Sequence, residues 1–449
     1  MWKAGYGQVV AVSFVVCLIV GALTIQWARP GQSPSCRPLT AASVVRDDAW
    51  TNRFAAYGDG NTRLDDWTGA DGTWSVGLPD GRTVWIFADT FLGPVRPGPN
   101  PRGQPYAWRS PFTAPLIHNS AILENADGAL TTTLRGSAAA GAPAAWIGAG
   151  STYWPMSAVF DDGALQVFLQ RIGAPDERHP FGVVRRAAVA TVPSAHLDRP
   201  GPITFLPRPR RDAAGEQVFY GLSALRAGRY VYIYGATSNT TRGGQSAYLA
   251  RVPAGRVTHL DDWRYWHGTD DGMGDGAGDG VDDGMGDGTG DGRDDARGAD
   301  AVDVARGMDG GRGRRGGAAG GDDEWGGAAG ARPVLPFVPR RSGVSAGFSV
   351  VRVNGTYVLF TTDPTRPVGG ISHIASYWSC DPAGPWHGPT PVYDPPEVVR
   401  GGTTYAYFPF AHPEQGGPGL LLSYDLNDTR RTHDNVGLYR PKFIRVSLR

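Results

Sequence analysis

The feature that most constrains the fold of this chain is a strand-turn-strand pattern that recurs along most of its length. Short runs rich in β-branched and aromatic residues are separated by turns such as Asp-Gly and Asn-Gly, and helix-period patterns are scarce. The predicted strand pairs are 154–160 with 164–171, 220–225 with 229–236, 345–353 with 356–362, and 405–412 with 419–424. Further strands are expected at 247–252, 372–379 and 442–448.

A hairpin at 71–89 precedes these pairs and gives five similar units in total. Each unit begins with a strand of small or polar residues and continues with a more apolar strand, as in the blades of a β-propeller, where the first strand lines a central channel. We therefore predict an all-β, five-bladed β-propeller over residues 38–449, with 442–448 completing the first or the last blade. A β-sandwich would give similar strands and stays open as an alternative.

The first hairpin brings two carboxylates together. The turn 79–81, Pro-Asp-Gly, sets a register in which Ser75 faces Trp85 and Asp71 faces Asp89. Directly opposed residues have Cβ atoms about 5 Å apart, and like charges at that distance are destabilising. We interpret such a pair as one retained for function.

The N-terminal 29 residues are predicted to be a membrane segment. Residues 9–25 are almost wholly apolar, and the run is close to the length that spans a bilayer. An uncleaved signal anchor is favoured over a cleaved signal peptide, and residues 30–37 are expected to be a linker. Either interpretation places the body outside the cytoplasm, anchored to the membrane or secreted.

Cysteine usage leaves one pairing open. Of three cysteines, Cys17 lies in the apolar N-terminal run, so Cys36 and Cys380 remain as partners in an oxidising compartment. Sequence alone does not place their Cα atoms within bridging distance.

Residues 269–331 interrupt the strand pattern. The segment consists largely of Gly, Asp, Ala and Arg, with very few apolar residues to offset the entropy of ordering. We predict a disordered insertion within the propeller. A Ca²⁺-binding β-roll is the alternative, but its nonapeptide period is missing.

Charge and motif content narrow the function. Lys+Arg and Asp+Glu both total 43, so nothing indicates a nucleic-acid partner. No Gly-x-Ser-x-Gly elbow is present, which disfavours a serine esterase. We expect no organic cofactor and no metal, and we expect a monomer.

Asp71 and Asp89 are the candidate catalytic residues. Two close carboxylates titrate apart, one staying protonated while the other ionises, and glycoside hydrolysis requires such an acid and base or nucleophile. The structural alternative is that Asp71 and Asp89 only fix turns. Polar residues on other predicted inner strands are the candidate substrate-binding residues: His118, Asn119, Trp154, Ser223, Ser345, Tyr405 and His412.

The run 71–93 followed by His118-Asn119-Ser120, together with the ending at 439–443, resembles an actinobacterial domain family that contains mycobacterial endo-D-arabinanases. The resemblance implies a five-bladed propeller that hydrolyses arabinofuranosyl linkages of cell-wall arabinan, with its carboxylate pair at Asp71 and Asp89. This chain departs at Ala88, where the family pattern has Gly. A non-catalytic surface propeller that binds glycan or a partner protein, and a hydrolase of another linkage, are the competing hypotheses.

Overall fold

The computed structural model describes residues 36–61, 63, 66–177, 182–208, 210–212, 214–238, 243–268, 324–366, 373–428 and 430–449. The compact unit formed by these residues spans Cys36–Arg449. The predicted N-terminal membrane segment, and residues 269–323 of the predicted insertion, lie outside the described residues.

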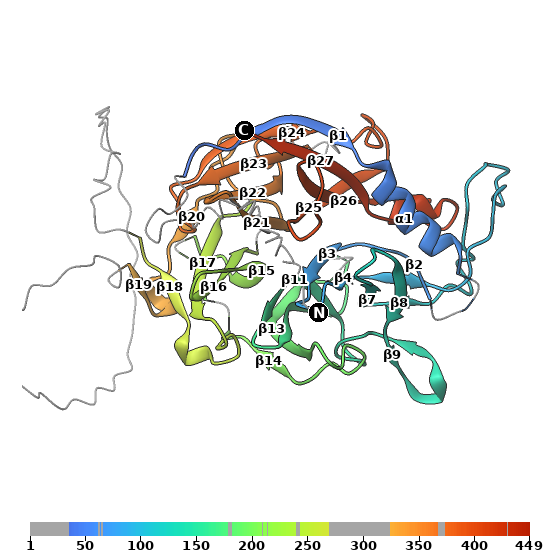
Figure 1. Ribbon diagram of the computed structural model, residues 1–449, viewed down its shortest axis with the longest axis horizontal. Helices are drawn as coiled ribbons and strands as arrows, with labels where there is room; N and C mark the ends of the chain where they lie inside the picture. The colour runs from blue at the N-terminus through green and yellow to red at the C-terminus, as the bar shows by residue number, and fades with distance from the viewer. Residues whose placement is uncertain are drawn as a thin grey trace, which may run out of the picture. The chain divides into compact units, whose positions relative to one another are not determined.

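Five antiparallel sheets of four or more strands follow one another along the chain (Figure 1). Sheet I contains β3 (Trp74–Gly77), β4 (Thr83–Phe87), β7 (Ser120–Glu124) and β8 (Leu130–Leu134). Sheet II contains β11 (Tyr153–Asp161), β12 (Ala164–Ile172), β13 (Val184–Pro193) and β14 (Ile203–Phe205). Sheet III contains β15 (Val218–Ala227), β16 (Tyr230–Thr237), β17 (Ala247–Pro253), β18 (Arg264–Trp266) and β19 (Trp325–Gly326), with β20 (Pro333–Leu335) paired to β17. Sheet IV contains β21 (Phe348–Val353), β22 (Thr356–Thr362), β23 (Ile374–Ser379) and β24 (His387–Tyr393). Sheet V contains β25 (Tyr405–His412), β26 (Leu420–Asn427), β27 (Lys442–Leu448) and β1 (Ala41–Arg46).

Smaller elements complete the unit. A three-stranded sheet is formed by β2 (Trp67–Ala70), β5 (Thr90–Leu92) and β6 (Leu116–Ile117), and a short ladder by β9 (Gly136–Ser137) and β10 (Pro143–Ala144). The helices are α1 (Asp48–Asp59) and the 3₁₀ turns η1 (Ala139–Gly141), η2 (Leu260–Asp262), η3 (Ala328–Gly330) and η4 (Val436–Tyr439).

The sheets have a propeller-like arrangement. Their first strands contact one another in a closed cycle, from β3 to β11, β15, β21, β25 and back to β3 (Figure 1). A separate apolar cluster fills the space between each pair of neighbouring sheets, as Trp74 and Ile86 do against Leu165 and Val167 between sheets I and II. The all-β prediction and its five strand units are confirmed in this part of the chain.

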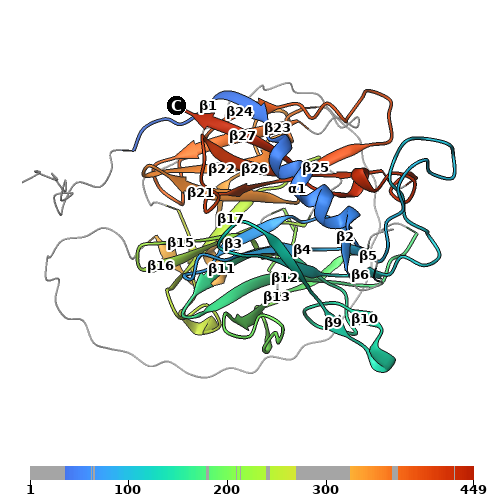
Figure 2. The same ribbon diagram turned by 45° about the vertical axis from the view of Figure 1, so that its right-hand side comes forward.

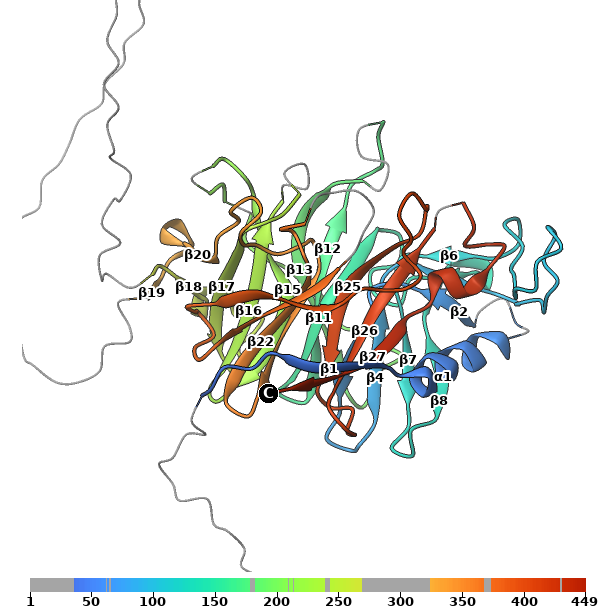
Figure 3. The same ribbon diagram turned by 90° about the horizontal axis from the view of Figure 1, so that it is seen from above.

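The last sheet is completed by both ends of the unit. β27 pairs with β26, as the sequence allowed, and β1 then pairs with β27 as the outer strand (Figure 3). Backbone bonds between Thr40 and Arg449 extend this pairing. A disulfide joins Cys36 to Cys380, with Cα atoms 5.5 Å apart, so the pairing that sequence left open is present.

Helix α1 spans the 12 residues Asp48–Asp59. Asp47 caps it by accepting a hydrogen bond from the backbone N–H of Trp50 at 3.1 Å. Trp50 and Phe54 then pack against Trp85 of sheet I and Phe443 of sheet V. Figure 2 shows α1 between these two sheets. Apolar contacts with distant residues, rather than helix-forming residues, stabilise this helix.

Two further findings concern the predicted insertion and the predicted membrane segment. Residues 324–331, which were assigned to the disordered insertion, form β19 and η3, because Trp325 packs on Trp266 of β18. Among the residues that the structure describes, no helix is both long and apolar enough to cross a bilayer.

Candidate functional site

Asp71 and Asp89 lie where one long strand ribbon passes from the small three-stranded sheet into sheet I. Ser75 is opposite Trp85 in β3 and β4, so the predicted register is confirmed there. At the end of the ladder, the N–H of Asp71 donates to the carbonyl of Asp89 at 3.4 Å, and the N–H of Ala88 donates to the carbonyl of Asp71 at 2.8 Å. Asp71 therefore faces both residues of the partner strand, as in a β-bulge.

Gly72 makes this close approach possible. Its φ is 71°, and a Cβ at this position would come within 3.1 Å of both Cβ and N of Ala88. The methyl group of Ala88, the departure from the arabinanase-family pattern, is itself buried. It fills the space that Gly72 leaves empty.

The carboxylate of Asp71 is held in an environment that disfavours its charge. The Tyr407 hydroxyl donates to Oδ2 at 2.7 Å, and the side chain of Tyr439 is a second hydrogen-bonding neighbour of this carboxyl group. Burial is the main cause that raises the pKa of Asp71 well above its usual value, and the charges of Asp89 and Asp425 raise it further. Asp71 is therefore suited to carry a proton near neutral pH.

Asp89 has polar partners instead. Its Oδ1 accepts a hydrogen bond from Nε1 of Trp154 at 2.9 Å and lies 3.1 Å from Nδ1 of His118. The hydrogen bond with Asp89 raises the pKa of His118, so the protonated imidazole is favoured as a donor. Donors of this kind stabilise a carboxylate anion.

A third carboxylate, Asp425 of β26, supports the segment that carries Asp71. Its Oδ2 accepts the backbone N–H groups of Gly72 at 2.7 Å and Thr73 at 3.3 Å, and its Oδ1 accepts the Thr73 hydroxyl at 2.7 Å. Asp425 is fully buried, and burial raises its pKa to about 7. This residue positions Asp71 from the neighbouring sheet V.

A cavity of about 760 Å³ adjoins this group through Trp154, which both lines the cavity and binds Asp89. Its lining comes from sheets II, III and V and includes Met156, Gln170, Arg185, Phe219 and Phe408. Apolar walls with a few polar side chains are usual for ligand pockets.

The structure separates the predicted substrate-binding residues. His118 and Trp154 contact Asp89. Tyr405 lies next to Tyr407, with ring centroids 5.4 Å apart, and the charge of Asp71 contributes to raising its pKa after burial. These three side chains lie around the carboxylate pair.

The other four have partners elsewhere. Asn119 is buried, where it donates to the carbonyls of Ile147 and Tyr153 and accepts the N–H of Ile147. Ser223 accepts the N–H of Val350, and Ser345 donates to the carbonyl of Gly347. His412 is buried between sheets I and V, with Ser75 and Ser423 on its two ring nitrogens. Their hydrogen bonds stabilise sheets and turns, so we do not keep them as substrate-binding residues.

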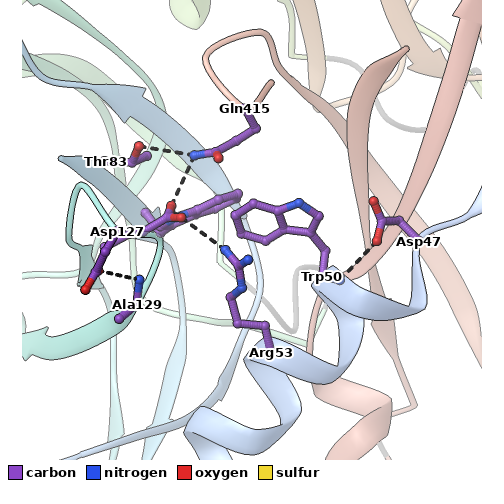
Figure 4. Close-up of polar contacts among 9 residues, drawn as sticks. Asp47, Trp50, Arg53, Thr83, Asp127, Ala129 and Gln415 are labelled. Atoms are coloured by element: carbon purple, nitrogen blue, oxygen red, sulfur yellow. Dashed lines mark hydrogen bonds and ion pairs between the residues drawn. The ribbon is translucent and has the colours of Figure 1, made fainter. Parts of the chain in front are cut away.

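Glu124 illustrates a buried carboxylate with a structural role. Arg53 of α1 and Gln415 donate to its carboxylate, at 3.1 Å each. Figure 4 shows the side chains of Arg53 and Gln415 pointing towards each other. Nε1 of Trp85 adds a third donor at 2.7 Å. Both oxygens of Glu124 thus have partners.

Sequence reasoning missed Asp425 and Tyr407. Asp425 is the one acidic residue of β26 and lies between Tyr424 and Leu426, and an acid in this mainly apolar strand was a usable signal. Tyr407 lies in a strand of several aromatic residues and has no distinguishing pattern. Among the described residues, no group of three or more His, Cys, Asp or Glu side chains is arranged to bind a metal ion.

Comparison with known proteins adds a family model and a fold. A model described as a domain of unknown function (DUF5005) matches residues 54–276. None of the curated protein sequences matches the chain. The comparison does not confirm the resemblance to the family of mycobacterial endo-D-arabinanases.

Among solved structures, a Bacteroides ovatus protein reported as a candidate hydrolase is similar at a TM-score of 0.55, with 16% identity over 93% of this chain and 92% of that one. A GH43_1 enzyme of Xanthomonas citri complexed with xylotriose has a TM-score of 0.39, with 13% identity over 89% of this chain and 93% of its own. An exo-β-1,3-galactanase of Clostridium thermocellum has a TM-score of 0.40, with 10% identity over 89% of this chain and 61% of its own. The first similarity supports the fold.

Proposed function

We propose that this protein is a glycoside hydrolase that uses Asp71 and Asp89 as its carboxylate pair. The observation that carries the proposal is the contrast between their surroundings. Asp71 is held by a tyrosine hydroxyl in a site that raises its pKa, and Asp89 is held by an indole N–H and a histidine. Glycoside hydrolysis requires one carboxyl group that gives a proton and one that acts as an anion.

In this mechanism Asp71 protonates the oxygen of the leaving sugar. Asp89 acts on the opposite side of the anomeric carbon, either as the nucleophile or as the base that activates water. Trp154 keeps Asp89 oriented by its Nε1 hydrogen bond and offers its ring to the substrate in the 760 Å³ cavity. Tyr407 orients the acid, and Asp425 fixes the backbone behind it.

Among the described residues, no Arg or Lys forms an ion pair with Asp71, and this favours hydrolysis over binding alone. An Arg or Lys held between the two carboxylates would keep both ionised and idle. Among the described residues, the ion pairs of this region include only His118 with Asp89, and none joins Asp71 to an Arg or Lys. A non-catalytic glycan-binding protein would have no need to keep Asp71 without such a partner.

For the substrate we propose arabinofuranosyl linkages of cell-wall arabinan, which rests on the family resemblance of the 71–93 segment. An extracytoplasmic location agrees with the Cys36–Cys380 disulfide, because such bonds persist in oxidising compartments. The predicted N-terminal anchor would then hold the enzyme beside the wall. β-1,3-Galactan and xylan are the comparison substrates, since similar structures act on or bind such sugars.

The test is hydrolysis of purified arabinan by the full chain, followed by analysis of the released sugars. We expect Asp71→Asn and Asp89→Asn each to lower the rate by at least about 10²-fold. Asp80→Asn is the matched control, because Asp80 lies at the exposed turn of the same hairpin and pairs only with Arg82. Full activity of either active-site variant would refute the catalytic assignment.

Product analysis also determines whether the enzyme acts in the endo or exo mode and whether it retains or inverts the anomeric configuration. Release of arabino-oligosaccharides would establish endo action, and release of free arabinose would establish exo action. The anomeric configuration of the first product, followed by NMR, decides whether Asp89 is the nucleophile of a retaining reaction or the base of an inverting one. Cleavage of galactan or xylan without cleavage of arabinan would replace the proposed substrate and keep the proposed chemistry.

A further inference from the structure

A second cavity of about 270 Å³ lies between sheets II and III, outside the carboxylate site. Ala187 and Leu206 line it from the side of sheet II, and Phe219 and Tyr220 of β15 line it from sheet III. Ala328 of η3 lies on a further side. The cavity is of a size to hold one small ring.

Aromatic side chains make up much of its wall. The rings of Tyr220 and Tyr265 meet edge to face, with centroids 5.2 Å apart. Nε1 of Trp263 donates to the carbonyl of Val257 at 2.9 Å, so this indole ring is fixed in place. Fixed aromatic rings are well suited to pack on the apolar face of a sugar.

Three arginines line the same cavity. Arg208, Arg210 and Arg211 are exposed lining residues, and Asp212 is the one acidic residue of the lining, so these four residues carry a net charge of 3 − 1 = +2. Burial raises the pKa of Tyr265 to about 12, and the charge of Arg210 opposes this rise. Arg211 gives one N–H to the carbonyl of Gly215 at 2.5 Å.

We propose that this cavity binds an anionic sugar, with its ring on the tyrosines and its carboxylate or phosphate group on the arginines. A neutral sugar would need the aromatic wall but not three cations. Guanidinium groups bind carboxylate and phosphate oxygens through paired N–H donors. Phe219 lines both this cavity and the 760 Å³ cavity. Binding of the anionic sugar does not rest on the proposed hydrolase function.

The experiment measures binding of three probes to the full chain at one ionic strength: D-glucuronate, glucose 6-phosphate and D-glucose. Ligand-observed NMR or calorimetry gives the dissociation constants. We expect at least one anionic probe to bind about tenfold or more tightly than glucose, because hydrogen bonds to charged groups are stronger than those between neutral groups. Preference for glucuronate identifies a carboxylate ligand, and preference for glucose 6-phosphate identifies a phosphate ligand.

Variants locate the binding. The double variant Arg208→Gln with Arg210→Gln should weaken the favoured anionic probe by about tenfold or more and leave glucose unchanged. Arg199→Gln is the control, because Arg199 is an exposed arginine that pairs with Asp198 and lines neither cavity. Tyr248→Phe removes a hydroxyl that lies 3.5 Å from Asp212, at the cavity wall, and should weaken the same probe.

Equal affinity for glucose and both anions, or an unchanged affinity in the double variant, would overturn the proposal. The two proposals fail separately. Asp89→Asn should abolish hydrolysis and leave probe binding intact, and a chain that binds the anionic probe but cleaves no glycan would refute the hydrolase alone. Hydrolysis without any anionic preference would refute this second site alone.

Discussion

The carboxylate of Asp425 accepts the backbone N–H of Gly72 at 2.7 Å, although the two residues are 353 positions apart in the chain. The contact links sheet V to the segment that carries Asp71, the acid of the proposed reaction. Asp425→Asn should therefore lower stability as well as activity. The two oxygens of the carboxylate accept hydrogen bonds from three donors, whereas an amide has only one acceptor oxygen. A buried donor left unpaired costs about 1–3 kcal/mol.

Urea unfolding and hydrolysis, measured together, check this prediction. Thr73→Ser keeps the hydroxyl that binds Asp425 and should lose less than Asp425→Asn in both assays. Unchanged stability of Asp425→Asn would contradict the supporting role.

The pH dependence of hydrolysis should reveal the state of Asp71. The hydrogen bond from Tyr407 lowers the pKa of Asp71 against the larger effect of burial. Tyr407→Phe removes this bond, so the pKa rises further and the protonated acid persists to higher pH. The basic limb of the kcat/KM profile should move to higher pH. A limb that stays in place or moves to lower pH would assign it to another group.

Glycine at position 72 should be required for close approach of the two strands. Gly72→Ala combines a positive φ with a Cβ only 3.1 Å from Ala88. Gly163→Ala is the matched control, because Gly163 has a φ of 76° and open space around it. The control should cost about 1–2 kcal/mol of backbone strain, and Gly72→Ala should cost more. If denaturant unfolding showed equal losses of unfolding free energy in the two variants, Ala88 would have to shift to make room for the new Cβ.

Acid sensitivity of the fold should depend on His412. Burial, and secondarily Arg445, lowers its pKa to about 3, so the folded protein holds this imidazole neutral. A base with a depressed folded pKa contributes stability that is present above its unfolded pKa of about 6.5 and is lost as the pH falls towards 3, by up to about 1.4 kcal/mol per pH unit.

The check compares the native protein with His412→Gln between pH 7 and pH 4. The variant should be less stable at pH 7, because contacts to Ser75 and Ser423 change, but its stability should fall less steeply with acid. Parallel curves would contradict the prediction.

The disulfide should stabilise the folded protein, so reduction of this bond should lower the Tm. Breaking Cys36–Cys380 releases a loop of 344 positions in the unfolded chain, and loss of a native disulfide typically costs about 2–5 kcal/mol. Cys36→Ser should lower the Tm and make it insensitive to reducing agent. A native Tm that reductant leaves unchanged would count against this contribution.

Local chemistry explains why the strands could be predicted. Asn354-Gly355 and Pro79-Asp80-Gly81 determine their turns within a few residues, and the register of the first hairpin follows from its turn. The pair Asp71 and Asp89 was accessible to sequence reasoning for the same reason.

The rest of the site depends on contacts that no local pattern encodes. Alternation along a strand gives two faces but does not say which one meets the cavity. The sequence predicts Asn119, Ser223 and His412 as substrate-binding residues, and in the structure their side chains form hydrogen bonds with neighbouring segments. Asp425 acts on residues more than 350 positions away, and α1 is stabilised by Trp85 and Phe443 rather than by its own sequence.

Pairing of β1 with β27 sets an order on folding. Sheet V receives its outer strand from residues 41–46 and the adjacent strand from residues 442–448. During synthesis, β1 therefore stays without its partner strand until almost the whole unit has been made. A chain released early would expose the unpaired edge of β26, and unpaired edges promote aggregation. Sheet V can therefore reach its full set of strands only in a chain that extends through β27.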